Sequence, residues 1–143
     1  MIYSAPEKDA EFLLFDVFDV EQIWSKIADF RDIDRSTVEA IIAEGSRLSA
    51  QTLFESFQES THSGCDWNGG QVSAPKEFKN AFKELTSGGW LGLSGNPRFG
   101  GQGMPKMLGF LIEEMFWARN ASLYLRSTLT VGASLCIDSH GSE

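Results

Sequence analysis

Cysteine, proline and long apolar segments are scarce in this sequence of 143 residues, which contains two cysteines and four prolines. Cys65 and Cys136 lie far apart and match no metal-ligand or redox spacing, so we expect two reduced thiols. No apolar run approaches the roughly 20 residues of a membrane-spanning helix. Residues 1–7 also lack the basic start and apolar core of a secretory signal, which predicts a cytoplasmic chain with no membrane span.

Basic residues are few as well. The sequence has 12 lysines and arginines against 20 aspartates and glutamates, which gives a formal net charge of −8. Binding to nucleic acid or to an anionic membrane needs clustered positive charge, so this composition argues against both partners. The length corresponds to one domain of ordinary size, spanning residues 1–143, with its own hydrophobic core.

Apolar residues recur at helical intervals while strand patterns are weak, and this predicts an all-α fold. Pro6 suits the first turn of a short helix, because its missing N–H would be unpaired there. The broad apolar side of that helix would be formed by Phe12, Leu14, Phe15 and Phe18.

The longest helix is expected near residues 37–59, after Ser36 and Glu39 at capping-box spacing. Residues 60–75 are polar and aperiodic, which predicts a loop that contains His62. Pro75 would begin the next helix, and Gly88 and Gly89 would end it. Its apolar face would consist of Phe78, Ala81, Phe82 and Leu85.

Two further helices are predicted near the end of the sequence. Pro105 would begin the first, with Met107, Leu108, Leu111, Met115 and Ala118 on its apolar face. Residues 120–122 offer Asn and Ser as caps for the last helix. That helix would run through Leu123, Leu125, Leu129 and Val131 toward Ile137.

Few residues have the pattern of a catalytic or metal site. Glu113 and Glu114 are adjacent on a predicted helix and point about 100° apart, so they cannot jointly flank one substrate atom. His62 and His140 have no Cys, Asp or Glu at ligand spacing, which argues against a metal site. We therefore assign no catalytic and no metal-binding residue.

The glycine-rich loop, residues 90–105, is the most distinctive segment. Residues 100–103 read Gly-Gly-Gln-Gly, but they lack the Lys-Ser/Thr of a P-loop and the preceding strand of a dinucleotide fingerprint. Sharp turns and close passage beside neighbouring helices explain the glycines better than a phosphate cradle does. Trp90 and Phe99, which flank the loop, could face a domain interface.

Taken with residues 76–79, 130–133 and 138–143, this loop resembles the amino-terminal helical domain of the acyl-CoA dehydrogenases. Residues 3–9, Tyr-Ser-Ala-Pro-Glu-Lys-Asp, are similar to the start of the larger bacterial members. Residues 60–64 lack the proline and asparagine that family members carry before the turn at 66–69, so the local loop path differs. The resemblance implies an all-α domain that precedes a flavin-binding β-domain and a second helical domain, for which 143 residues leave no room.

The resemblance also implies residues that line the acyl pocket. In the family the corresponding last helix forms the far wall of that pocket, which places Leu123, Tyr124, Ser127, Thr128 and Val131 on or near it. Helical spacing agrees in part, because Leu123, Ser127 and Val131 follow at i, i+4 intervals beside the row of Tyr124 and Thr128. Alternatively, these side chains pack against neighbouring helices.

The activity implied by the resemblance is FAD-dependent α,β-dehydrogenation of an acyl-CoA thioester, in fatty-acid or related acid catabolism. The chain alone would lack the flavin domain and the catalytic glutamate, so we expect no FAD to bind it, no activity and self-association through uncovered apolar surface. The alternative is a standalone, non-catalytic helical binding module derived from the same domain. An acyl-CoA oxidase would share the fold.

Overall fold

The computed structural model describes residues 4–142. Tyr3 and Glu143, which belong to the segments quoted for the resemblance, lie outside this range. The described chain is mostly helical and carries one two-stranded sheet, so the expectation of an all-α fold holds except for that sheet. No helix within residues 4–142 is long and apolar enough to span a membrane.

The amino-terminal helices are α1 (Glu7–Glu11), a π-helical segment η1 (Phe12–Val17) and α2 (Val20–Trp24). A short helix after Pro6 is therefore correct, but its predicted apolar side is only partly buried. Leu14 and Phe15 are buried, whereas Phe12 is 57% and Phe18 is 47% exposed. The π-helical turn changes the angular spacing of side chains, so intervals counted for an α-helix no longer select one face.

The helix predicted over 37–59 extends from α3 (Arg35–Leu48) through a π-helical segment η2 (Ser49–Leu53) into α4 (Phe54–Ser63). Asp34 caps it by accepting a hydrogen bond from the Thr37 N–H at 2.7 Å. The predicted capping box is wrong, because the Ser36 hydroxyl donates to Asp34 and Glu39 pairs with Arg35 instead. The acidic side chain two residues earlier competes successfully for the free N–H.

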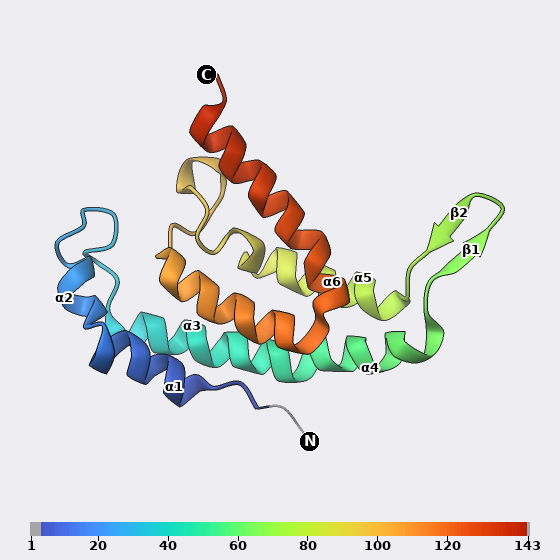
Figure 1. Ribbon diagram of the computed structural model, residues 1–143, viewed down its shortest axis with the longest axis horizontal. Helices are drawn as coiled ribbons and strands as arrows, with labels where there is room; N and C mark the ends of the chain where they lie inside the picture. Colours follow the sequence, from blue (N-terminus) through green and yellow to red (C-terminus); the bar gives the residue numbers. More distant parts are fainter. Residues whose placement is uncertain (1–3, 143) are drawn as a thin grey trace.

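Helix α6 (Lys106–His140) consists of two helices that meet at a kink, and each is shorter than the continuous run from Arg35 to Ser63. Asn120 interrupts it with φ −147° and ψ 74°, and its side-chain oxygen accepts a hydrogen bond from the Leu123 N–H at 3.0 Å. The two predicted helices and the cap between them are therefore confirmed as a first arm, residues 106–119, and a second arm, residues 121–140. Figure 1 shows the arms as a V with the glycine-rich loop between them.

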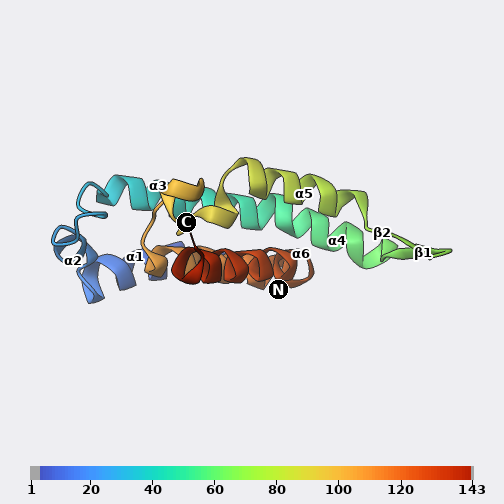
Figure 2. The same cartoon turned by 90° about the horizontal axis from the view of Figure 1, so that it is seen from above.

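Residues 60–75 do not form one loop. Residues 60–63, with His62, are the last turn of α4, and β1 (Asp66–Asn68) then pairs antiparallel with β2 (Gln71–Ser73). Gly69 and Gly70, with φ of 55° and 94°, form the turn that joins the strands. The hairpin projects beyond the ends of α4 and α5 (Figures 1 and 2), and its residues are exposed, so no alternation of buried side chains marked it in the sequence.

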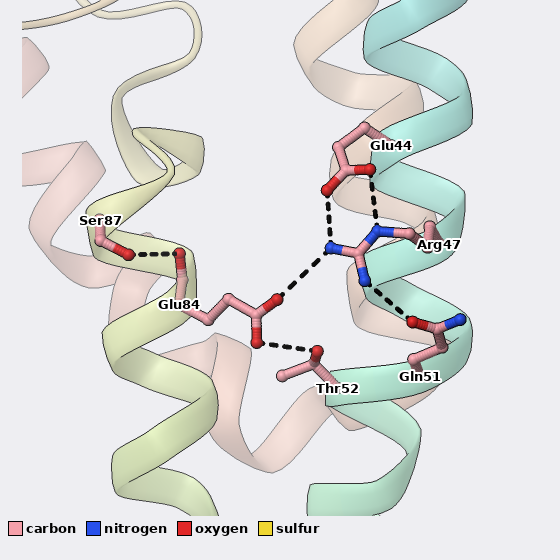
Figure 3. Close-up of polar contacts among 6 residues, drawn as sticks. All are labelled: Glu44, Arg47, Gln51, Thr52, Glu84 and Ser87. Carbon is pink, nitrogen blue, oxygen red and sulfur yellow. Dashed lines mark hydrogen bonds and ion pairs between the residues drawn. The ribbon is translucent and has the colours of Figure 1, made fainter.

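Helix α5 (Lys76–Ser87) agrees with its prediction: it begins after Pro75 and ends at Gly88 and Gly89. Ala81 and Leu85 are buried, and Phe78 and Phe82 pack partly buried against the core. Its polar side faces α3 and η2, as Figure 3 shows. Arg47 pairs with Glu44 at 2.6 Å and reaches Glu84 at 3.5 Å, while the Thr52 hydroxyl donates to Glu84 at 2.9 Å. These pairs are exposed, so they orient α5 more than they stabilise it.

The hydrophobic core lies mainly between α3, η2 and the first arm of α6. Two predicted members of the first arm, Leu108 and Met115, are buried, whereas Met107 and Ala118 are exposed. The second arm runs through the residues expected for it; Leu123 is buried, and Leu125, Leu129 and Ile137 are exposed. The largest fully buried side chains include Leu14, Ile42, Leu48, Leu53, Leu85, Leu108, Ile112 and Phe116.

Candidate functional site

A cavity of about 770 Å³ lies between the end of α5, the glycine-rich loop and both arms of α6. The loop contributes Trp90, the two 3-10 turns η3 (Trp90–Gly92) and η4 (Pro97–Phe99), and glycine backbone. At the open end of the V, the Asn96 amide donates to the Asp138 carboxylate at 3.0 Å. This exposed bond links the loop to the second arm.

Glycines let the loop fold tightly against itself. A Cβ atom at Gly101 would overlap the Gly95 backbone, so this crossing of the chain requires glycine. The Gln102 N–H donates to the Gly92 carbonyl at 2.8 Å, and the Gly103 N–H donates to the Gly95 carbonyl at 3.0 Å. The amides of residues 99–104 all bond within the loop, so its Gly-Gly-Gln-Gly segment offers no free amide nest for a phosphate.

Trp90 and Phe99, which were predicted to face a domain interface, both line this cavity. Trp90 also contacts Phe116 of the core edge to face, with ring centroids 5.6 Å apart. Phe99 is exposed at the rim. Nothing in residues 4–142 identifies a domain that covers them, so that role stays a prediction.

Three of the five residues assigned to substrate by resemblance, Ser127, Thr128 and Val131, line the cavity. Leu123 and Tyr124 do not line it, because they lie close to the bend and pack into the core. The Tyr124 ring contacts the rings of Phe116 and Trp117 edge to face. The bend thus divides the predicted continuous face into a buried part and a cavity-lining part, and contact of any of the five with substrate stays a prediction.

Polar groups also occur in the cavity wall. Ser127 is only 2% exposed, and its hydroxyl oxygen has no hydrogen-bond partner among the described residues. Burial raises the pKa of the half-buried Glu113 carboxyl, and the charge of Lys106 partly opposes that rise. Burial, with a smaller contribution from the Glu113 charge, raises the pKa of the Tyr124 hydroxyl above its usual range.

Sequence reasoning considered Glu113 only as a catalytic partner of Glu114 and missed its place in the cavity. It also missed Arg126, whose guanidinium lies over the Phe82 ring at 4.5 Å from the centroid, and Phe110, an exposed cavity-lining residue. Glu113 lies seven residues before Asn120 and Ser127 lies seven after it. This equal spacing from the predicted cap could have suggested that Glu113 and Ser127 share one cavity. The suggestion holds only if the two helices fold back on each other, which the sequence does not show.

Within residues 4–142, no group of three or more His, Cys, Asp or Glu side chains could hold a metal ion. His62 bonds through its Nδ1 atom to the Gln58 carbonyl, one turn earlier on α4, at 2.8 Å. Cys65 and Cys136 are free and exposed.

No protein-family model matches the chain. The chain is 25% identical over 143 residues to the 3-methylmercaptopropionyl-CoA dehydrogenase of Ruegeria pomeroyi, an alignment that covers all of the chain and 24% of the relative. It is 27% identical over 125 residues to the broad-specificity linear acyl-CoA dehydrogenase FadE5 of Mycobacterium tuberculosis, covering 86% of the chain and 20% of the relative. The chain thus spans about a quarter or less of these two acyl-CoA dehydrogenases, and it is similar to them over most of its own length.

Proposed function

We propose that this chain forms the helical amino-terminal part of an acyl-CoA dehydrogenase, and that the cavity between the arms of α6 receives the acyl group. The observation that carries the proposal is the similarity to two acyl-CoA dehydrogenases, together with a cavity lined by Ser127, Thr128 and Val131. A cavity of about 770 Å³ is within the size range of small-molecule sites.

The proposed activity of the whole enzyme is removal of hydrogen from the α and β carbons of an acyl thioester, with FAD as the cofactor that accepts it. The described residues do not fit that cofactor, because the amides of residues 99–104 bond within the loop and no strand leads into it. We therefore assign no flavin contact and no catalytic base to this chain. Its proposed task is to hold the acyl group and to keep water away from it.

The role of the cavity residues follows from their positions. Trp90 and Val131 offer apolar surface on opposite walls, the loop and the second arm. The exposed hydrogen bond between Asn96 and Asp138 links these walls at the open end of the V. A preformed slot of this kind restricts the acyl chain to few conformations, which is how a binding domain contributes to rate without contacting the reacting atoms.

Titration of the chain with octanoyl-CoA, followed by the fluorescence of its tryptophans, tests this proposal directly because Trp90 lines the cavity. We expect a saturable change with octanoyl-CoA and none with free CoA at the same concentrations. A Val131→Phe variant should abolish the change by filling the cavity, whereas Ser122→Gln on the same arm replaces an exposed side chain outside the cavity lining for comparison. Equal responses to octanoyl-CoA and CoA would reject an acyl site here.

A further inference from the structure

An arginine of the second arm of α6 lines the cavity. Arg126 lies six residues after the bend at Asn120 and belongs to the cavity wall. Its guanidinium carbon lies over the Phe82 ring of α5, 4.5 Å from the ring centroid, and Phe82 lines the same cavity. The face of an aromatic ring attracts a cation, so this contact holds the positive charge of Arg126 at the wall.

Arg126 has no carboxylate partner within residues 4–142. Glu113 and Asp138 also line the cavity, but neither lies within ion-pair distance of the guanidinium, and no described residue accepts a hydrogen bond from it. Asp138 follows on the same helical arm, about 18 Å along its axis, and accepts a hydrogen bond from the Asn96 amide. The chain has 20 acidic residues against 12 basic ones, yet the charge of Arg126 is left for another partner.

Its position in the cavity distinguishes Arg126 from the other arginines more than its missing ion pair does. Arg35 and Arg47 pair with carboxylates on their own helix, at 2.7 Å and 2.6 Å. Arg98 lies over the ring of its neighbour Phe99 and has no ion pair in the described chain, but it does not line the cavity. A guanidinium presents its N–H donors as a planar fork that matches a carboxylate or a phosphate.

The next residue is a separate indication that the cavity takes a polar ligand. Ser127 lines the cavity and is 2% exposed, and its hydroxyl oxygen has no hydrogen-bond partner among the described residues. On the same arm, Thr128 and Ser134 each donate to a carbonyl of their own helix at 2.9 Å. A buried hydroxyl without a partner costs free energy, which a polar group of a ligand recovers. Adjacent helical residues point about 100° apart, so Ser127 and Arg126 are treated as separate contacts.

We propose that Arg126, supported by the Phe82 ring, is an anion-binding subsite of the cavity that pairs with an anionic oxygen group of the ligand. This inference rests on the proposed function, because it takes an acyl-CoA as the ligand. Two parts of such a ligand carry this chemistry: a carboxylate at the far end of a dicarboxylic acyl group, and the phosphates of CoA. Either one forms charge-assisted hydrogen bonds with the guanidinium fork.

The test compares three ligands titrated into the full chain by calorimetry: octanoyl-CoA, the mono-CoA thioester of octanedioic acid, and S-octanoylpantetheine, which lacks the phosphates. If the carboxylate is the partner, the octanedioic thioester should bind about three to ten times more tightly than octanoyl-CoA, as one partly exposed charged pair predicts. If a phosphate is the partner, octanoyl-CoA should have that advantage over S-octanoylpantetheine. Added salt should reduce either advantage.

Arg126→Gln should bring the advantage close to one. Arg98→Gln is the matched control, because it makes the same change in net charge at an arginine that also lies over a phenylalanine ring but outside the cavity lining. It should leave the advantage unchanged. Phe82→Leu should reduce the advantage in part, since the guanidinium loses its support. Circular dichroism identifies a variant that fails to fold, and Arg126→Met then replaces Arg126→Gln.

The outcomes separate the subsite from the proposed function. An advantage that is lost in Arg126→Gln and kept in Arg98→Gln supports the subsite, and the ligand pair that shows it identifies the carboxylate or the phosphate as the partner. If octanoyl-CoA binds but neither pair shows an advantage, or if both variants change it equally, the anion subsite is rejected while the acyl site stands. If none of the three ligands binds, the proposed function fails together with the subsite.

Discussion

At the residue scale, Ser127 combines two properties that normally exclude each other. It belongs to the cavity wall, yet it is 2% exposed and its hydroxyl has no partner in the described chain. Its position seven residues after the bend places it where the second arm leaves the core. Ser127 therefore packs against the core and also lines the cavity. Both interpretations of the predicted acyl wall, contact with the acyl group and packing against neighbouring helices, apply to it.

Replacing Ser127 with Phe should narrow the cavity and overpack the core at once. We expect the unfolding free energy to fall by about 1–3 kcal/mol and the affinity for octanoyl-CoA to fall more than that for butanoyl-CoA. Titrations with both ligands and a thermal melt measure the two effects. Ser122→Phe, at an exposed position on the same arm, should change neither. Equal losses for the short and the long acyl group would remove Ser127 from the acyl wall.

Glu113 gives a pH-dependent prediction. Burial raises its pKa above the ordinary value of 4.5, so the folded state holds the proton more tightly than the unfolded state. The carboxyl therefore destabilises the fold increasingly as pH rises from 4.5 through the raised pKa, and the penalty is constant above it. Glu113→Gln should raise Tm at pH 7, and the gain should vanish below pH about 4. Glu114→Gln is the control; a gain that is independent of pH would contradict the assignment.

At the element scale, the bend at Asn120 lets both arms of α6 line one cavity. Its side-chain amide donates to the Ser56 hydroxyl at 2.8 Å, while its oxygen caps the second arm. The Ser49 hydroxyl on η2 donates to the Met115 carbonyl at 2.9 Å, just before the bend. A buried polar network thus joins α6 to η2 and α4 where the helix changes direction. Without it a helix of this composition has no local reason to fold back.

Asn120→Ala should destabilise the protein by about 2–3 kcal/mol, because it removes a helix cap and leaves buried partners unpaired. Urea unfolding measures that loss. Asn80→Ala, at an exposed position in α5, provides a matched control and should change stability little. Octanoyl-CoA should bind the Asn120 variant more weakly as well, since the arms are no longer fixed. A loss no larger than that of the control would show that core packing alone sets the bend.

Elements with local signals were the predictable ones. Pro75, Pro105 and Asn120 mark helix starts through their own backbone and capping chemistry, and the structure agrees with all three. The hairpin β1–β2 was missed because its strands have three residues each and bury no face. The π-helical segments were missed because a one-residue shift in hydrogen bonding depends on tertiary packing.

At the scale of the whole molecule, the cavity itself could not be predicted. Its walls come from α5, the glycine-rich loop and both arms of α6, which meet only because the bend at Asn120 has a particular angle. Helical spacing correctly grouped Ser127 with Val131, but it could not tell that Leu123 and Tyr124 turn into the core. The sequence therefore predicted the residues of this helix face, but not which of them line the cavity and which pack in the core.

The absence of a flavin cradle in the described chain gives a prediction for the purified protein. The chain should be colourless, should keep no stoichiometric flavin after mixing with FAD and gel filtration, and should not reduce a dye with octanoyl-CoA. The physical reason is that the amides of residues 99–104 already bond within the loop. Absorbance at the flavin wavelengths is the measurement. Retention of one FAD per chain would reject the division of tasks proposed for the enzyme.

Apolar surface on the second arm carries the last prediction. Leu129 is 70% and Ile137 is 68% exposed, and Phe110 is exposed on the other arm, so large apolar side chains of both arms meet water. Exposed apolar patches usually mark interfaces, and we expect the purified chain to bind a hydrophobic dye and to self-associate as its concentration rises. Sedimentation velocity over a range of concentrations measures the association.

Replacing both Leu129 and Ile137 with Gln leaves the net charge unchanged and should reduce both dye binding and association. Thr130→Gln on the same arm should reduce neither. A protein that stays monomeric at high concentration and binds no dye would instead favour an independent module over part of a larger enzyme.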